Sequence, residues 1–353
     1  MAVETIYRTC NLCEAICGLE VKVENNKVLS IKGDELDTFS RGHICPKAVS
    51  LKDLHEDPDR LKKPLIKKEG KWEEVDWDEA IKYAARSLVD VQIKHSKDAV
   101  AVYQGNPSVH NLGTSLFSPE FVRSIKTKNR YSATSVDQLG HHLAADYMLG
   151  NGLSVPVPDI NRTDYWVIMG GNPMVSNGSL MTAPDIRGRI RGIHERGGKI
   201  IVIDPRFTET SEKADQHIYI KPGTDIYVLL GMINYVFENE LVKLDHLVNS
   251  IDEQDILGIK ESVSAYTLEN VSARTGIPQE ILNTLMAEFT SAKKAVFYGR
   301  LGVSASKHGG LCHWAINTIN ILTGNFDQEG GAMLANPAVN VSSKKYPAPR
   351  FGR

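Results

Sequence analysis

Lys199-Ile-Ile-Val-Ile-Asp-Pro-Arg206 is an apolar run that ends in an acid, a proline and a base. A short continuous apolar run of this kind predicts a strand buried on both faces. Similar runs at 99–103, 165–169 and 295–298 predict further strands, and the stretches 181–196, 226–240, 279–289 and 311–322 predict helices. Strands that alternate with helices of this length predict an α/β fold, with Rossmann-like open parallel sheets and helices on both faces.

Turns with glycine or polar residues follow three of the predicted strands. They are Tyr103-Gln-Gly-Asn-Pro107, Met169-Gly-Gly-Asn-Pro173 and Ile203-Asp-Pro-Arg206. The carboxyl ends of parallel strands form the ligand crevice of such a sheet, and glycine lets backbone amides approach a phosphate. Asp204 is placed to accept hydrogen bonds from ribose or guanine, and Lys221-Pro-Gly-Thr-Asp225 opens the next helix. None of these is a GxGxxG or Walker A sequence, so simple turn chemistry is the alternative for each.

Four of the five cysteines fall in the first 45 residues, as Cys10, Cys13, Cys17 and Cys45. Three closely spaced thiolates can wrap one face of a cluster, and a fourth from a distant loop can close it. Structural zinc usually takes two separated pairs, so the spacing favours a [4Fe–4S] cluster over zinc or unmetallated core cysteines. Cys312 lies in a predicted helix and is expected to be a small buried apolar residue.

The segment after the triplet predicts a β-hairpin. Leu19, Val21 and Val23 alternate with charged residues, and Asn25-Asn26 offers a turn. We therefore expect a small β-rich module over residues 1–60, whose core a metal supplements. The α/β region is expected over 61–335, with a helix that begins near Asp76, and an irregular tail over 336–353.

Composition excludes several classes of protein. The 353 residues carry 41 basic and 43 acidic side chains, a net charge of −2, with 42% hydrophobic residues. This is typical of a globular protein and argues against a broad nucleic-acid surface. No apolar run approaches the roughly 18 to 20 residues of a membrane span, and no export signal is visible at the N-terminus. The expected compartment is the cytoplasm.

Several short motifs combine with the cysteine spacing to give a family resemblance. They are Leu61 with Pro64, Gly70-Lys-Trp, Val75-Asp-Trp-Asp-Glu-Ala and the Gly-Asn-Pro turns. From about Thr5 to Met333 the chain resembles the molybdopterin oxidoreductases, and more narrowly the bis-molybdopterin guanine dinucleotide (dimethyl sulfoxide reductase) family. The resemblance implies a [4Fe–4S] cluster that exchanges electrons with the pterin cofactor. It also places Lys47 between the two, although a solvated lysine is the alternative.

The resemblance further implies a set of contacts to the pterin guanine dinucleotide. The residues that match the family's positions are Gly171, Asn172, Asp204, Arg206, Gly223 and Asp225. Arg300 and Gly302 follow the last predicted strand and are expected to line the same cavity.

In this family molybdenum or tungsten is bound by four dithiolene sulfurs and usually one side chain. The corresponding region, 131–142, contains no cysteine, so Asp137 is the favoured ligand, with Ser135 and Ser132 as alternatives. Asp137 also fits as the N-cap of a helix over 138–149. His141 and His142 are candidate proton donors near the metal, or simply one buried and one exposed helical histidine.

The resemblance implies a molybdenum- or tungsten-dependent oxidoreductase. It would couple two-electron oxo transfer or dehydrogenation of a small-molecule substrate to one-electron steps through the cluster, toward an electron-transfer partner protein. The alternatives are an electron-relay subunit that has lost the pterin and a zinc-stabilised binding module. The presence of Asp204, Lys221 and Asp225 argues against the relay, because a relay need not keep nucleotide contacts.

The length of the chain bears on its activity. Relatives are longer and add a C-terminal dinucleotide-binding domain with a β-barrel-like shape. We therefore expect a fragment, a truncated gene product or one part of a split enzyme, with the truncation in the tail from residue 336. Independent catalysis by this chain alone is doubtful.

Overall fold

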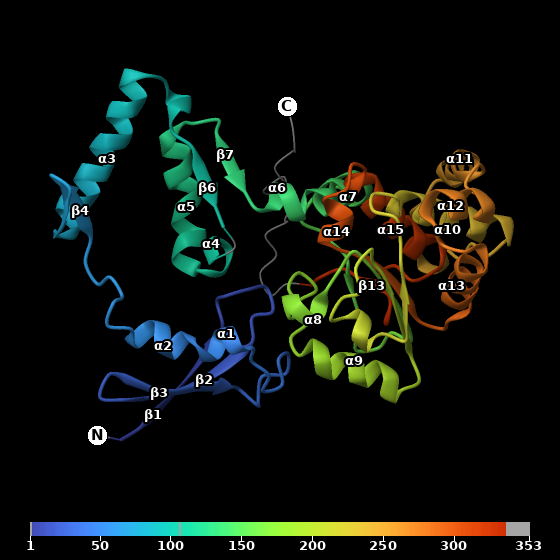
Figure 1. Cartoon of the computed structure of the whole chain (residues 1–353), viewed down its shortest axis with the longest axis horizontal. Coiled ribbons are helices and arrows are strands. Elements are labelled where there is room, and N and C mark those ends of the chain that lie inside the picture. The colour runs from blue at the N-terminus through green and yellow to red at the C-terminus, as the bar shows by residue number, and fades with distance from the viewer. Residues whose placement is uncertain (1, 106, 337–353) are drawn as a thin grey trace. The chain divides into compact units, whose positions relative to one another are not determined.

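A computed structural model describes residues 2–105 and 107–336 of the chain. The chain divides into two compact units, Met1–Ala133 and Thr134–Arg353 (Figure 1). Asn106, in the first predicted Gly-Asn-Pro turn, and the predicted tail from residue 337 onward lie outside the described residues. The predicted boundary at residue 60 stays a prediction.

The first unit begins with a three-stranded antiparallel sheet of β1 (Glu4–Thr9), β2 (Gly18–Glu24) and β3 (Lys27–Gly33), in that order. Asn25 and Asn26 connect β2 to β3 with φ values of 49° and 63°. Asparagine tolerates this left-handed backbone, which a tight two-residue hairpin turn requires at both central positions. The predicted hairpin is therefore confirmed. Two short helices, α1 (Pro46–Val49) and α2 (Leu51–Glu56), follow the sheet.

The remainder of the first unit holds a hairpin, a long helix and a small α/β element. Its parts are β4 (Leu65–Lys68), β5 (Lys71–Glu74), α3 (Trp77–Lys94), the 3-10 helix η1 (Lys97–Ala99), β6 (Val102–Gln104), α4 (Pro107–His110), α5 (Leu112–Ile125) and β7 (Arg130–Ser132). Helix α3 begins as predicted, because the Asp76 carboxylate accepts a hydrogen bond from the Glu79 amide at 2.7 Å. The strand predicted from residue 99 begins only at Val102, because η1 occupies the preceding residues.

The second unit is built around a parallel sheet with the order β11-β10-β9-β12. These strands are β9 (Tyr165–Met169), β10 (Lys199–Ile203), β11 (Gln216–Ile218) and β12 (Ala295–Gly299). Val167 of β9 pairs with Ile201 of β10 and Phe297 of β12, and all three are buried. Successive residues of β9, β10 and β12 alternate between two apolar cores, one on each face of the sheet. Continuous apolar strands are needed because both faces are covered.

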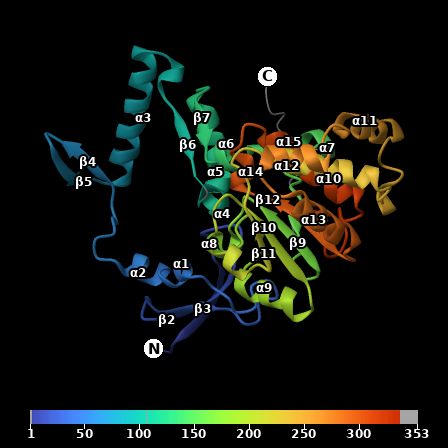
Figure 2. The ribbon, with the colours of Figure 1, turned by 45° about the vertical axis from the view of Figure 1, so that its right-hand side comes forward.

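Helices cover both faces of this sheet, which confirms the predicted α/β architecture (Figure 2). Helix α9 (Ile186–Glu195) contributes to one core, while α10 (Asp225–Glu238), α13 (Gln279–Ser291) and α15 (Gly309–Leu322) contribute to the other. The helix predicted from residue 181 begins later, because Asp185 is its N-cap and accepts a hydrogen bond from the Gly188 amide at 3.1 Å.

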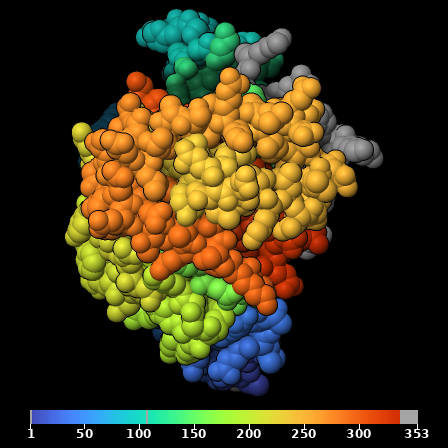
Figure 3. Space-filling model, turned by 90° about the vertical axis from the view of Figure 1, so that its right-hand side faces the viewer, coloured from blue at the N-terminus to red at the C-terminus, as the bar shows by residue number. Residues whose placement is uncertain are grey.

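Smaller elements complete the second unit. They are α6 (Thr134–Asp137), α7 (Leu139–Leu149), β8 (Val157–Pro158), α8 (Pro173–Ser176), the 3-10 helices η2 (Ser211–Lys213) and η3 (Asp245–Leu247), α11 (Glu253–Val263), α12 (Leu268–Thr275), α14 (Leu301–Ser304) and β13 (Ala332–Met333). Strands β8 and β13 form an antiparallel pair apart from the main sheet. The yellow and orange helices of the α10–α13 region form most of the face in Figure 3.

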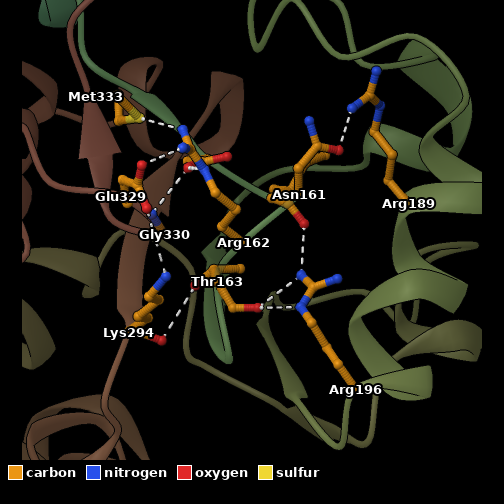
Figure 4. A network of polar contacts seen from close by, with 11 residues as sticks. Asn161, Arg162, Thr163, Arg189, Arg196, Lys294, Glu329, Gly330 and Met333 are labelled. Atoms are coloured by element: carbon orange, nitrogen blue, oxygen red, sulfur yellow. Dashed lines mark hydrogen bonds and ion pairs between the residues drawn. The ribbon is translucent and has the colours of Figure 1, made fainter.

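A polar network fixes the loop that leads into β9 (Figure 4). The Arg196 guanidinium donates to the backbone carbonyls of Thr163 at 2.8 Å, Ile160 at 2.9 Å and Gly192 at 2.7 Å. Arg162 pairs with Asp159 at 2.5 Å and with Glu329 at 2.7 Å, which ties the same loop to the segment before β13. These contacts lie at the amino end of the sheet, away from the strand ends that carry the predicted cofactor residues.

We expect Arg196→Met to lower the free energy of unfolding by about 1–3 kcal/mol, because the methionine keeps much of the apolar stem but leaves three carbonyls without their charged donor. Chemical denaturation monitored by circular dichroism measures this change. Arg191→Met on the exposed side of α9 is the matched control. Equal denaturation midpoints for the two variants would contradict the assigned role of Arg196.

Candidate functional site

The cysteine triplet lies in the loop that connects β1 to β2. The Cys10 amide donates to the Cys17 carbonyl at 2.8 Å, and the Ile16 amide donates to the Cys13 carbonyl at 3.2 Å, so the loop doubles back on itself. Cys45 lies far along the chain at the N-cap of α1, where Pro46 occupies the first helical positions. The fold thus brings the fourth cysteine to the triplet, and all four belong to one apolar cluster.

Burial dominates the chemistry of these thiols. Cys10, Cys17 and Cys45 are 6–8% exposed. Burial, followed by the neighbouring thiols, raises the pKa of Cys17 to about 11, and burial is also the main cause that raises the pKa of Cys10. The Lys47 ammonium acts in the opposite direction on the pKa of Cys10, so the exposed Lys47 lies within electrostatic range of the thiols.

The four thiols suit an iron–sulfur cluster, which is bound by thiolates spread around several iron atoms. Cys10, Cys17 and Cys45 are buried, Cys13 packs against them, and the other three thiols each raise the pKa of Cys17. This grouping is compatible with the predicted [4Fe–4S] cluster.

At the carboxyl end of the main sheet, the backbones that leave β9 and β12 cross closely. Gly170 has φ of 60°, and a Cβ atom on Gly302 would lie 2.8 Å from the Gly170 Cα atom. The Gly302 amide donates to the Gly170 carbonyl at 2.9 Å, and the Arg300 amide donates to the Met169 carbonyl at 3.1 Å. Only glycine permits such an approach. At the carboxyl ends of β9 and β12, the backbone at Gly170 and Gly302 is therefore not covered by side chains of these two residues.

Polar side chains line the neighbouring strand ends. Asn172, at the N-cap of α8, donates to Glu209 at 2.7 Å and accepts from Thr210 at 2.7 Å. Arg206 donates its amide to the Asp204 carboxylate at 2.8 Å, and its guanidinium lies 3.3 Å from Glu209. The hydrogen bond from Asn172, with a smaller effect of Arg206, lowers the pKa of Glu209. The structure therefore joins three predicted residues in one network.

Asp204, directly after β10, and Asp225, at the start of α10, lie within electrostatic range of each other. Gly223 has φ of 77° and Asp225, the first residue of α10, is 8% exposed. Burial and then the Asp204 carboxylate raise the pKa of Asp225. Two carboxylates in electrostatic contact at the carboxyl edge of a parallel sheet form an acceptor site for hydrogen-bond donors of a ligand. Gly171 also lies at this edge, where its Cβ position is 3.1 Å from that of Arg300.

Asp137 is the last residue of α6, and the alternative that it caps the following helix is wrong. Gln138 occupies the N-cap of α7 and makes no side-chain cap hydrogen bond. The Asp137 Oδ1 atom is buried and has no hydrogen-bond partner among the described residues. The Arg300 guanidinium donates to the Asp137 backbone carbonyl at 3.4 Å, which links this residue to the strand edge. A buried carboxylate oxygen without a partner suits a metal ligand, because coordination would satisfy it.

The two serine alternatives have other surroundings. Ser135 is exposed on α6, and Ser132 lies at the end of β7 in the first unit. Both residues have interactions of their own. The geometry thus distinguishes Asp137 from the serines, and its role as ligand stays a prediction.

His141 and His142 are both buried, at 7% and 9% exposure, so the alternative of one buried and one exposed histidine is wrong. His142 makes a 2.6 Å hydrogen bond through Nδ1 to the Gly152 carbonyl. His141 instead stacks on His313, with ring centroids 3.5 Å apart. Burial, followed by the neighbouring His313 and Arg300, holds the pKa of His141 well below its usual value.

Sequence reasoning missed Glu209, Thr210 and His313. Glu209 and Thr210 follow the Asp-Pro-Arg turn and contact Asn172, which lies 37 and 38 residues earlier in the chain. His313 follows Cys312, which is 1% exposed as predicted for a buried apolar residue. The apolar surroundings of His313 in the sequence were the available signal that it is buried.

Two family models match almost the whole chain. The model described as "Molybdopterin oxidoreductase Fe4S4 domain" matches residues 4–56, and the model described as "Molybdopterin oxidoreductase" matches residues 60–347. The first covers all four cysteines of the cluster site. The second covers Asp137 and every residue of the strand edge described above.

Curated relatives of similar sequence include two oxidoreductase subunits. The F420-dependent formate dehydrogenase subunit alpha of Methanocaldococcus jannaschii is 27% identical over 94% of this chain and 47% of its own length. The thiosulfate reductase molybdopterin-containing subunit PhsA of Salmonella typhimurium is 28% identical over 91% of this chain and 41% of its own length. The chain thus spans about half the length of the curated relatives it matches.

A solved structure shares the fold. Acetylene hydratase from Pelobacter acetylenicus superposes with a TM-score of 0.76 and 22% sequence identity, over 92% of this chain and 44% of that chain. In the part of the chain that the structure describes, no helix has the length and apolar character of a membrane span.

Proposed function

Because this chain belongs to the molybdopterin oxidoreductase family, we propose that it supplies the cluster site and part of the cofactor cradle of a molybdenum- or tungsten-dependent oxidoreductase. The cofactor would be bis-molybdopterin guanine dinucleotide. The observation that carries the proposal is the Asp137 carboxylate, with an oxygen atom buried and without a partner among the described side chains. An electron-relay subunit without pterin would hold no metal for such an oxygen to coordinate.

Different residues of the chain would hold different parts of the cofactor. Asn172, Arg206 and the glycine crossing would hold the phosphate groups, while Asp204 and Asp225 would accept hydrogen bonds from ribose or guanine. Lys47 would lie on the electron path between cluster and pterin. When bound, the pterin-held metal supplies two-electron oxo transfer or dehydrogenation, and the cluster supplies one-electron transfer to a partner protein.

We propose a small anion as the class of substrate. Formate dehydrogenase and thiosulfate reductase, the relatives named above, act on small anions according to their names. Arg300 is half-buried beside Asp137 and supplies a positive charge next to the proposed metal position. A fixed guanidinium is well suited to orient a carboxylate or an oxyanion.

The cofactor content of the full chain, purified anaerobically from a host that makes the cofactor, tests this function. We expect about four iron atoms per chain, together with molybdenum or tungsten and guanine nucleotide after acid hydrolysis. The double variant Asp204→Ala/Asp225→Ala should lose most of the guanine nucleotide, because its acceptors are gone, while iron content stays unchanged. The Glu253→Ala/Glu261→Ala variant on α11 is the control with the same loss of charge.

The competing functions give different results in the same measurement. Iron without molybdenum, tungsten or guanine nucleotide would identify an electron-relay subunit. A colourless protein with zinc would identify a zinc-stabilised module and would overturn the cluster assignment as well.

A further inference from the structure

A pair of stacked histidines, His141 of α7 and His313 of α15, connects these two helices. The rings of His141 and His313 lie with centroids 3.5 Å apart and planes inclined by 29°. Both side chains are buried, at 7% and 2% exposure. Two imidazoles buried in contact are unusual, because each is a polar group that must be satisfied away from water.

Two glycines make room for the His313 ring. A Cβ atom on Gly140 would lie 2.9 Å from His313 Cδ2, and a Cβ atom on Gly299 would lie 3.3 Å from His313 Cε1. The remaining nitrogen contact is a 2.8 Å hydrogen bond between His313 Nε2 and Ser304 Oγ. The position of His313 is therefore fixed by shape on two sides and by a hydrogen bond at one end.

The two nitrogens of His141 have different surroundings. The Gly299 backbone is near enough to act on the His141 ring as a hydrogen-bond acceptor, whereas the Nε2 atom is buried without a hydrogen-bond partner among the described residues. The Gly299 contact therefore falls on Nδ1, which must carry a proton to donate to a carbonyl. In the neutral ring this leaves a bare lone pair on Nε2. His141 lines a cavity of about 10 Å³ together with His313, Tyr298 and Asn317.

We propose that His313 is a positioning residue for His141, which it holds by ring stacking as the neutral Nδ1–H tautomer with the Nε2 lone pair free to accept a hydrogen bond. The consequence for catalysis rests on the proposed function, since a neutral imidazole fixed in this way would orient a hydrogen-bond donor of the substrate or of a bound water. Burial, with a further effect of Arg300, lowers the pKa of His313 to about 3, so His313 itself stays neutral and serves as a ring to stack on.

Nitrogen NMR on the full chain labelled with ¹⁵N-histidine tests the proposal without any turnover. In the unsubstituted protein at neutral pH, His141 should show one protonated Nδ1 and one bare Nε2. His313→Ala should give exchange between tautomers at His141, whereas His313→Phe should keep the single tautomer, because phenylalanine preserves the stack. His308→Ala at the exposed start of α15 is the matched control and should leave the His141 signals unchanged.

Gly140→Ala provides a second route to the same result, because its Cβ atom would displace the His313 ring with every imidazole retained. It should reproduce the effect of His313→Ala. A protonated Nε2 on His141 in the unsubstituted chain overturns the proposal even if every variant fails to fold. Unchanged His141 signals in folded His313→Ala also overturn it.

In the cofactor-loaded protein, His313→Ala should lower turnover roughly tenfold or more, and His313→Phe should restore most of it. Loss of turnover in both variants with intact His141 tautomer signals would contradict positioning by stacking. If the proposed function fails, no variant has turnover, yet the tautomer measurement still decides the role of His313.

Discussion

Replacing Cys17 by serine should leave the chain without its iron–sulfur cluster, with iron reduced from about four atoms per chain to about zero. Cys17 is 7% exposed and lies within electrostatic range of the other three N-terminal cysteines. Burial already raises the pKa of its thiol to about 11. A serine hydroxyl in the same place is a far weaker acid than a thiol, so it would not supply the anionic ligand that replaces the lost thiolate. Iron analysis and the visible absorption of anaerobically purified protein measure the outcome.

The chain contains its own control for this substitution. Cys312 is 1% exposed in α15 of the second unit, and Cys312→Ser makes the same atomic change outside the cluster site. Cys312→Ser should keep full iron content, while it lowers the stability of the second unit by placing a hydroxyl in an apolar core. Loss of iron in both variants, or in neither, would contradict the assignment of the four N-terminal cysteines.

Local sequence signals predicted the main elements of the fold. The strands at 165–169 and 199–203 have the predicted ends, because a buried parallel strand requires a continuous apolar run and each is bounded by polar or glycine residues. The hairpin turn at Asn25-Asn26 followed from the same kind of local rule. Two predicted element starts were too early. The apolar pattern of the helix from residue 181 extends beyond its N-cap Asp185, and that of the strand from residue 99 extends into the 3-10 helix η1 before Val102.

The candidate site was less predictable, because its contacts join residues far apart in the chain. The Asp-Pro-Arg turn indicated Asp204 and Arg206, but nothing local indicated that Glu209 would join Arg206 to Asn172. His313 likewise acquires its partners only when α15 packs on α7, through Gly140. The spacing of the cysteines was informative because four thiols so spaced have few structural uses other than metal binding.

Replacing Asp137 by alanine should abolish turnover and leave iron content intact, because the substitution lies in a different unit from the cluster cysteines. It should also hold or raise the stability of the cofactor-free chain, by up to about 1 kcal/mol, because it removes a buried oxygen that has no hydrogen-bond partner within the described chain. The N-cap variant Asp252→Ala removes an aspartate that accepts from the Gln254 amide at 2.9 Å, and should lower stability by about 1 kcal/mol. Denaturation curves of the two variants, measured without cofactor, separate a ligand carboxylate from a structural one.

The metal environment itself gives the decisive test of Asp137. X-ray absorption of the loaded protein should show an oxygen neighbour of the metal that is lost in Asp137→Ala, and Asp137→Cys should add a sulfur neighbour in its place, because a thiolate is a softer ligand at the same position. Ser135→Cys on the exposed side of α6 should leave the spectrum unchanged. A new sulfur neighbour in Ser135→Cys but not in Asp137→Cys would transfer the ligand role to the serine. Unchanged spectra and unchanged turnover in every Asp137 variant would remove Asp137 from the site, and its unsatisfied oxygen would then require a bound water or a further segment of protein as partner.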